Sequence, residues 1–408
     1  MCGPSPAVTA AVAGAEGNGV RPPYEVADVV RECRAEFLDR YRPSAEQRRV
    51  LRAIERCRTA ALGGHRRQCE VCGHEHIAYN SCSNRHCPKC QGKEHREWVA
   101  AEVGRLLPVD YFHVVFTLPH DLNPLIRVNR GLLYGLLFRA AAATLREFAR
   151  THLGVDLAVT AVLHTWGQTL TEHLHLHCLV SAGGLSLDGQ SFRRIPKRRR
   201  PFLFPVKALS PVFRDRFLRY LRRLHCRGHL RFAGQSAHLA QPACWETLLE
   251  QLQWQDWIVY SKPPFGSPTQ VLKYLGRYTH RIAISNRRLL FVGNGVVRFQ
   301  YYDYADGKRT KEMTLTAPEF LRRFLLHVLP SGFMRIRHYG LLANANREKL
   351  KRCRELLGVP AAEKLEPEAT VTSSQDTVDT PKPADRCPLC GGRLRVVEIL
   401  RPQPHDTS

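Results

Sequence analysis

The chain lacks any run of about 18 consecutive apolar residues, which is the length that a membrane-spanning helix requires. The longest apolar helix candidate, residues 131–148, is interrupted by Arg139, Arg146 and Glu147. Residues 1–23 lack the basic start and the compact apolar stretch of a secretory signal, so we expect a flexible tail there. These absences exclude a membrane-spanning protein, and we expect a cytoplasmic one.

Acidic residues are also scarce. The 408 residues include 37 Asp and Glu against 61 Lys and Arg, which leaves a formal net charge of +24. This balance excludes an acidic solvating protein and favours an anionic partner, either a nucleic acid or an acidic substrate. Hydrophobic residues make up 44% of the chain, with 17 Phe, 13 Tyr and 5 Trp, which is enough for one large core or several smaller ones. Global disorder is therefore excluded.

Cysteine is present in a pattern that indicates metal binding. A chain of this length needs no disulfides to be stable, and six of its 14 cysteines form Cys-x-x-Cys pairs. The first two pairs are separated by fourteen residues, a spacing that lets four thiolates surround a tetrahedral zinc ion. His74, His76, Cys82 and His86 lie between these pairs and leave the choice of ligands open. The predicted zinc ligands are Cys69, Cys72, Cys87 and Cys90.

The third pair, Cys387 and Cys390, has no second close pair nearby. Three interpretations stay open. In the first, the pair is half of a second zinc site that Cys353 or His405 completes. In the second, it is a turn of unpaired cysteines. In the third, the two cysteines are ligands of a site shared with another segment.

The apolar pattern predicts an α+β protein. Helical periodicity over residues 24–59 is interrupted near Pro43, and residues 69–91 have little periodicity. The expected strands are 111–118, 157–166, 257–261 and 173–181, the last of which ends in a turn at Gly183-Gly184, and a hairpin is expected at 289–302. Further helices are expected at 93–107, 129–151, 206–224, 245–254, 269–281, 318–329 and 342–357.

Composition divides the chain into successive segments. The expected boundaries are a flexible tail at 1–23, a helical segment and zinc-binding domain at 24–105, a main domain at 106–358, a linker at 359–386 and a carboxy-terminal Cys-x-x-Cys tail at 387–408.

Three histidines alternate with leucines in the predicted strand 173–181. His173, His175 and His177 therefore project from one face of the strand. Three protonated imidazoles at this spacing would repel one another, whereas three neutral ones can hold a divalent metal ion. Histidine suits a transition metal such as Mn²⁺, and Mg²⁺ would keep waters or substrate phosphate oxygens.

Two tyrosines share one face of the predicted helix 269–281. Tyr274 and Tyr278 are four residues apart, so their hydroxyls can enter one site, although packing alone also explains such a pair. Basic residues beside them and in a proline-flanked loop are candidates for contact with a nucleic-acid backbone. These are Lys273, Arg277 and Arg281 in the helix, and Lys197, Arg198, Arg199 and Arg200 in the loop. Arg66, Arg67, Arg85 and Lys89 surround the predicted zinc site.

Taken together, these motifs resemble those of transposases of the insertion sequence 91 family. These are rolling-circle enzymes with two tyrosines, an HUH (His-hydrophobic-His) motif and an amino-terminal zinc-binding domain. The motifs that carry the resemblance are 81–90, 111–119, 164–167, 173–177 with 183–185, the Tyr274/Tyr278 helix and 335–340.

The resemblance implies an HUH nuclease core, with a central antiparallel sheet flanked by helices. His175 and His177 would form the HUH pair, with His173 as the third ligand of Mg²⁺ or Mn²⁺, and Gln168 or His164 could replace His173. Tyr274 and Tyr278 would be the nucleophiles.

The implied activity is cutting and rejoining of single-stranded DNA through a 5′-phosphotyrosine intermediate, at the nucleoid in the bacterial cytoplasm. Alternatives are a replication initiator or relaxase with the same strand chemistry, a non-catalytic zinc-dependent DNA-binding regulator, and a metal-dependent hydrolase. The oligomeric state stays open.

Overall fold

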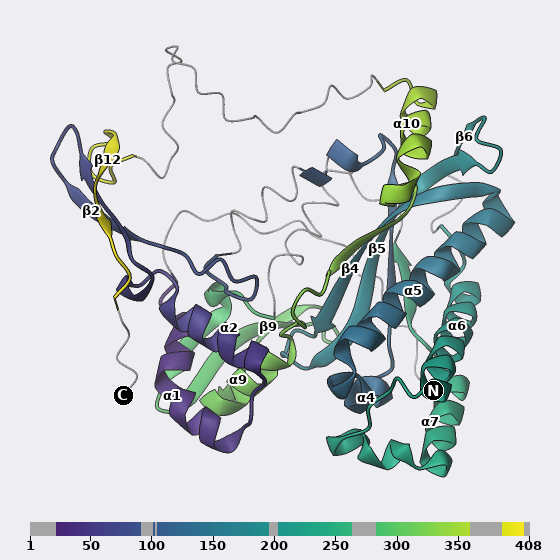
Figure 1. The fold of residues 1–408 in the computed structure, drawn as a ribbon, viewed down its shortest axis with the longest axis horizontal. Coiled ribbons are helices and arrows are strands. Elements are labelled where there is room, and N and C mark those ends of the chain that lie inside the picture. The colour runs from purple at the N-terminus through teal and green to yellow at the C-terminus, as the bar shows by residue number, and fades with distance from the viewer. Residues whose placement is uncertain are drawn as a thin grey trace.

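A computed structural model describes residues 22–90, 101–102, 104–195, 203–262, 283–359 and 386–403. In this part of the chain the strands form three antiparallel sheets, and helices pack against two of them (Figure 1). This confirms the predicted α+β class with antiparallel sheets flanked by helices. No helix within the described ranges is long and apolar enough to cross a membrane.

The largest sheet has the strand order β11-β4-β5-β3-β7, and β6 pairs with the far end of β5. Its long central strands hydrogen-bond along most of their length, which fixes the register between their side chains. The strands are β3 (Tyr111–Thr117), β4 (Val155–Trp166), β5 (Glu172–Ser186), β6 (Phe192–Arg194), β7 (Val259–Lys262) and β11 (Ile336–Gly340).

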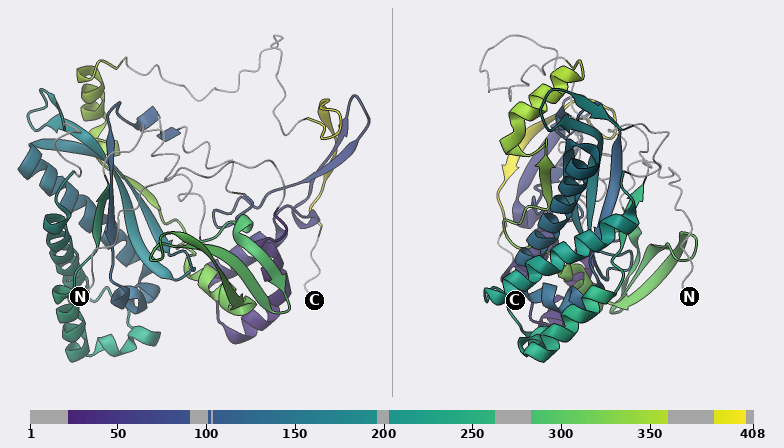
Figure 2. Two further views of the ribbon diagram at one scale, coloured as in Figure 1. Left: turned by 180° about the vertical axis from the view of Figure 1, so that it is seen from behind. Right: turned by 90° about the vertical axis from the view of Figure 1, so that its right-hand side faces the viewer.

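Helices cover one face of this sheet (Figures 1 and 2). Leu174, Leu176 and Cys178 of β5 point into the core beneath these helices, so the alternate residues of β5 face the opposite side. That opposite face is covered near the end of β5 by α10 (Arg347–Leu356), whose Cys353 is buried beside Leu179. The covering helices are α4 (Asn123–Val128), α5 (Arg130–Phe148), α6 (Val206–Cys226) and α7 (Pro242–Trp254).

A second lobe combines the amino-terminal helices with elements from residues 289–326. Phe37 of α1 and Phe320 and Phe324 of α9 are buried in one core with the sheet β10-β9-β8. The predicted interruption near Pro43 is confirmed, because Ser44 caps a new helix there in a reciprocal pair of hydrogen bonds with Gln47. The elements are α1 (Val26–Arg40), α2 (Ala45–Arg56), β8 (Leu289–Gly293), β9 (Val296–Asp303), β10 (Arg309–Thr316) and α9 (Ala317–Leu326).

The smallest sheet has the order β12-β1-β2 and stands apart from the large sheet (Figure 1). Its strands are β1 (Gly64–Cys69), β2 (Glu75–Tyr79) and β12 (Leu394–Leu400). The cysteine-rich stretch in which the sequence has little periodicity thus begins as a β-hairpin. Residues expected to form a carboxy-terminal tail supply the third strand of the same sheet, paired with β1.

The turn predicted at Gly183-Gly184 is wrong, because β5 continues through both glycines to Ser186. A Cβ atom on Gly184 would lie 2.2 Å from the carbonyl oxygen of Asp156 on β4, so glycine is required there for the close approach of two strands. The other predicted strands are confirmed, as are the helices at 129–151, 206–224, 245–254, 318–329 and 342–357. The helix at 269–281, most of the helix at 93–107 and nearly all of the linker at 359–386 lie outside the described residues.

Candidate metal centres

Histidines from two neighbouring strands converge on the face of the large sheet opposite α5 and α6. His164 of β4 is the register partner of His175 of β5, and His177 follows two residues further along β5. Their ring centroids are 4.2 Å apart for His164 and His177, 4.7 Å for His175 and His177, and 5.2 Å for His164 and His175. One ring nitrogen from each of the three lies within 4.8 Å of the others, which is close enough to share one metal ion.

Hydrogen bonds orient two of these rings. Nδ1 of His175 lies 2.9 Å from the carbonyl oxygen of His173 and donates to it, which leaves Nε2 of His175 with its lone pair toward the cluster. Nδ1 of His177 lies 2.7 Å from Nε2 of His113 on β3, and the two rings are stacked. This arrangement is typical of metal-binding histidines, in which the second ring nitrogen is held by another group.

The cluster is electrically neutral. Burial lowers the pKa of His175 and that of His113 to about 3, and lowers the pKa values of His164 and His177 well below 6.5. The charge of Arg335 further lowers the pKa of His164. Neutral imidazole is the form that binds metal ions, so the protonation state of the cluster fits a divalent ion.

For the third member of the cluster, the structure favours the alternative His164 over His173. It groups His164 with His175 and His177, while Nδ1 of His173 lies 3.1 Å from Nε2 of His120 at the start of β5. The physical reason is the register of β4 on β5, which places His164 directly opposite His175. His113, which orients His177, was missed although it lies on a predicted strand. Period-two alternation in residues 111–118 places His113 on one face of its strand with Val115. It does not indicate which neighbouring strand this strand pairs with.

The predicted nucleophiles and DNA-contacting residues lie outside the described residues. These are Tyr274 and Tyr278, the basic residues Lys273, Arg277 and Arg281 beside them, and the loop residues Lys197, Arg198, Arg199 and Arg200.

The four cysteines predicted to form one zinc site belong to two separate clusters. Cys87 and Cys90 gather with Cys57 and Cys82, whereas Cys69 and Cys72 gather with Cys387 and Cys390. The prediction of a single site from these pairs is therefore corrected. The hairpin of β1 and β2 carries the first pair away from the second, and each pair meets cysteines elsewhere in the chain. Among the interpretations of the third pair, the structure fits the one in which Cys387 and Cys390 share a site with another segment.

The first cluster lies in the core of the second lobe. Sγ of Cys90 lies 3.3 Å from Sγ of Cys57 and 3.5 Å from Sγ of Cys82. These separations exceed a disulfide bond of about 2.05 Å and approach the distance of about 3.8 Å between two thiolates on one tetrahedral zinc ion. Hydrogen bonds from Cys82 and Cys87 lower the pKa of Cys57 to about 7, toward the thiolate form. His86 is no ligand of this cluster, because its Nε2 accepts a hydrogen bond from the backbone N–H of Leu329.

Basic residues around the first cluster stabilise the fold. Nζ of Lys89 lies 2.5 Å from a carboxylate oxygen of Glu25, and both side chains are about nine-tenths buried. Arg85 donates hydrogen bonds to the carbonyl oxygens of Pro330 and Phe333. These two cations, expected around the zinc site, are thus engaged inside the protein.

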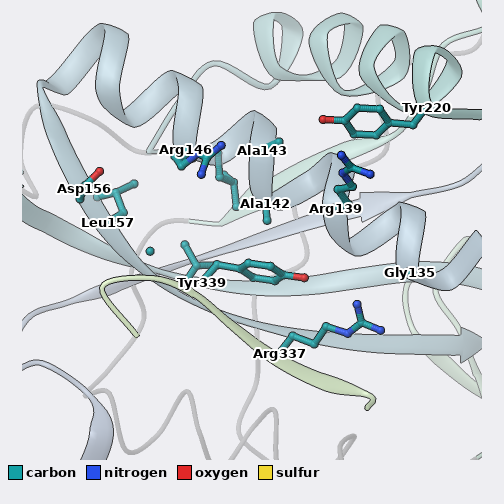
Figure 3. Close-up of a pocket in the computed structure, with 13 residues that line it drawn as sticks. Gly135, Arg139, Ala142, Ala143, Arg146, Asp156, Leu157, Tyr220, Arg337 and Tyr339 are labelled. Atoms are coloured by element: carbon teal, nitrogen blue, oxygen red, sulfur yellow. The ribbon is translucent and has the colours of Figure 1, made fainter. Parts of the chain in front are cut away.

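A pocket of about 310 Å³ lies on the other face of the large sheet (Figure 3). The guanidinium of Arg139 in this pocket lies over the ring of Tyr220, and that of Arg337 lies over the ring of Phe138. Leu157 and Val159 of β4 line the pocket and face the helices, so the sheet separates it from the histidine cluster.

Two family descriptions match separate parts of the chain. Residues 29–118 match a family described as "transposase zinc-binding domain", and residues 158–349 match one described as "putative transposase". A "putative transposase y4qJ" of Sinorhizobium fredii is 46% identical over 94% of this chain and 98% of its own length. The transposase for insertion sequence element IS801 of Pseudomonas savastanoi is 32% identical over 71% of this chain and 68% of its own.

Among solved structures, the conjugative relaxase TrwC, in its metal-free complex with OriT DNA, matches 46% of this chain and 83% of its own. The two sequences are 15% identical, and the TM-score is 0.24.

The matched domains and relatives define a transposase, an enzyme that acts on DNA strands, with an amino-terminal domain suited to zinc. The chain belongs to the insertion sequence 91 family of transposases.

Proposed function

We propose that the protein cuts and rejoins single-stranded DNA in rolling-circle transposition, by tyrosine attack at a divalent metal centre held by His164, His175 and His177. The single observation that carries the proposal is the convergence of three largely buried, neutral imidazoles from two adjacent strands. The family supplies the substrate class, which is DNA. We place the reaction in the bacterial cytoplasm, at the nucleoid.

The donor set fits a divalent ion. Nε2 of His175 is available because Nδ1 is occupied by a backbone carbonyl, and His113 occupies Nδ1 of His177 in the same way. Imidazole ligands favour Mn²⁺ or another transition metal, and Mg²⁺ would need additional oxygen ligands from water or phosphate. When bound, the ion would polarise the scissile phosphodiester and stabilise the charge that develops on it.

Other residues of the chain prepare the site for an anion. Arg335 adds positive charge beside His164, which a phosphodiester would offset. Trp166 stacks on His164 with 5.0 Å between ring centroids and so holds this ring in place. The excess of 24 positive charges favours binding of the DNA backbone as a whole.

Tyr274 and Tyr278 are the proposed nucleophiles. One tyrosine hydroxyl loses its proton to solvent as its oxygen attacks phosphorus, the bond from phosphorus to the 3′ oxygen breaks, and the 3′ oxygen takes up a proton and leaves as a hydroxyl. The 5′-phosphotyrosine conserves the phosphodiester bond energy, so a 3′-hydroxyl of another strand can reverse the reaction and join the ends. A second tyrosine permits two such transfers in sequence.

Labelled single-stranded DNA carrying an element end tests the proposal. We expect wild-type protein with Mn²⁺ to form an adduct that resists denaturant and to transfer the label to a second strand. Tyr274→Phe with Tyr278→Phe should abolish the adduct and keep binding, while Tyr301→Phe with Tyr302→Phe on β9 serves as the matched control.

The histidine centre is tested in the same assay. His175→Ala with His177→Ala should abolish metal-dependent cleavage, whereas His238→Ala, an exposed histidine, should not. An undiminished adduct in the Tyr274/Tyr278 variant would refute the mechanism. A free 5′-phosphate without adduct would indicate a hydrolase, and a salt-sensitive shift without cleavage would indicate a DNA-binding regulator.

A further inference from the structure

The cluster of Cys69, Cys72, Cys387 and Cys390 joins segments that are far apart in the chain. Cys69 and Cys72 lie at the turn between β1 and β2, and Cys387 and Cys390 precede β12. Sγ of Cys69 lies 3.5 Å from Sγ of Cys390, and Sγ of Cys72 lies 3.4 Å from Sγ of Cys390 and 3.6 Å from Sγ of Cys387. All four sulfurs lie within 4.8 Å of one another, as in a tetrahedral site.

Both Cys-x-x-Cys pairs adopt the same turn. The N–H of Gly73 donates to the carbonyl oxygen of Cys69, and the N–H of Gly391 donates to that of Cys387, at 3.1 and 2.9 Å. Each glycine follows the second cysteine and has a positive φ, +68° and +73°, which residues with a Cβ adopt at a cost. Two equivalent turns that face each other present four sulfurs to a common point.

Backbone N–H groups also point at the sulfurs. The N–H of Val71 lies 3.4 Å from Sγ of Cys69, and the N–H of Gly392 lies 3.4 Å from Sγ of Cys390. Hydrogen bonds of this kind stabilise a thiolate more than a thiol, because the thiolate is the better acceptor. The turns are therefore built for deprotonated sulfur, which is the form that binds metal.

The small sheet has almost no hydrophobic core of its own. The buried apolar residues of this cluster are Cys69, Cys387 and Leu394, while side chains on β2 and β12 such as Ile77, Val396 and Ile399 are exposed. Burial of so little apolar surface cannot offset the entropy of ordering three strands. A bound metal ion supplies stability of the size that small metal-dependent domains require.

We propose that these four cysteines form a second structural zinc site, which fastens the carboxy-terminal segment to the amino-terminal domain. Two of its ligands lie far beyond the matched zinc-binding domain of residues 29–118. Its zinc is independent of the ion at Cys57, Cys82, Cys87 and Cys90, because the two clusters share no ligand.

Zinc content of the full chain tests the number of sites. The measurement is made in a His175→Ala, His177→Ala background, so that the histidine centre contributes no zinc. We expect two zinc ions per chain, one after Cys387→Ser with Cys390→Ser, and two after the control Cys226→Ser with Cys244→Ser, whose cysteines belong to neither cluster. Unchanged zinc content in the Cys387/Cys390 variant would overturn the proposal, as would a wild-type content of one.

A second measurement on the otherwise wild-type chain does not depend on folding of the cysteine variant. A protease site is inserted between Ser373 and Ser374, the chain is cut, and the products are separated by size under native conditions. We expect the carboxy-terminal fragment to stay with the body when zinc is present and to be released by a chelator. Release while zinc is still bound, or retention after zinc removal, would overturn the role of the metal as the fastening.

Discussion

Protonation of one buried histidine should destabilise the protein at mildly acidic pH. His327 follows α9 and is fully buried where the second lobe meets the end of β4. Its Nδ1 lies 3.2 Å from Oγ1 of Thr165, next to His164, and its Nε2 donates a hydrogen bond to the carbonyl oxygen of Leu170 at 3.1 Å. Burial lowers the pKa of His327 to about 4.

The sign of the effect follows from this lowered pKa. The unfolded chain has a histidine pKa of about 6.5 and binds the proton more readily than the folded chain, so the stabilisation is present above pH 6.5 and is lost as the pH falls toward 4. For one such group, the free energy of unfolding decreases by about 2 kcal/mol between pH 7 and pH 5. The decrease approaches about 3.4 kcal/mol below pH 4.

Urea unfolding at pH 7, 6 and 5 measures this contribution when wild type is compared with His327→Gln. Glutamine keeps a donor for the Leu170 carbonyl and does not titrate, so we expect the wild type to lose about 2 kcal/mol more than the variant over this range. The other buried histidines are common to both proteins, and their contributions cancel. The exposed His238→Gln serves as the control and should behave as wild type does. Equal pH dependence of wild type and His327→Gln would refute the reasoning.

Three further predictions concern the large sheet. His164→Ala should weaken Mn²⁺ binding at least tenfold in calorimetry, whereas His173→Ala should change it less than threefold; the reverse order would restore His173 as the third ligand. Gly340→Ala should lower the free energy of unfolding by about 2 kcal/mol or more, because φ is +61° and a Cβ would lie 1.8 Å from a carbonyl oxygen of β4. The control Gly135→Ala in α5, where a Cβ meets open space, should not destabilise the protein. Equal effects of the two substitutions would contradict this account. Arg335→Ala should reduce adduct formation about tenfold, because it removes a partner for phosphate. The same substitution should strengthen Mn²⁺ binding, because it removes a charge that repels the ion. Loss of both adduct formation and Mn²⁺ binding would instead indicate a structural role for Arg335.

The sequence predicted those features that depend on a single segment. Alternation along residues 173–181 placed His175 and His177 on one face, because the two-residue period of a strand requires it. The identity of the third histidine depends on the register between β4 and β5, which neither strand determines by itself. His173 has the same spacing as its neighbours, but it lies where β5 begins and meets His120 instead.

The cysteines illustrate the same limit. Spacing within Cys69-x-x-Cys72 correctly indicates a tight turn, but it does not indicate which other pair that turn will face. Cys57 belongs to no motif, and it joins the first cluster because α2 ends there beside Cys90. Local patterns predicted which residues are suited to bind metal, whereas the long-range packing of the chain decided how they are grouped.

The separation between Cys72 and Cys387 has a consequence for synthesis of the protein. All cysteines of the first cluster have been translated by residue 90, whereas the second cluster is complete only with Cys390, 318 residues after Cys72. At about 5 to 20 residues per second, this interval lasts roughly 15 to 60 seconds. The small sheet is thus completed only after β12 has been translated, and a chain truncated before Cys387 leaves Cys69 and Cys72 without the two other cysteines of their cluster.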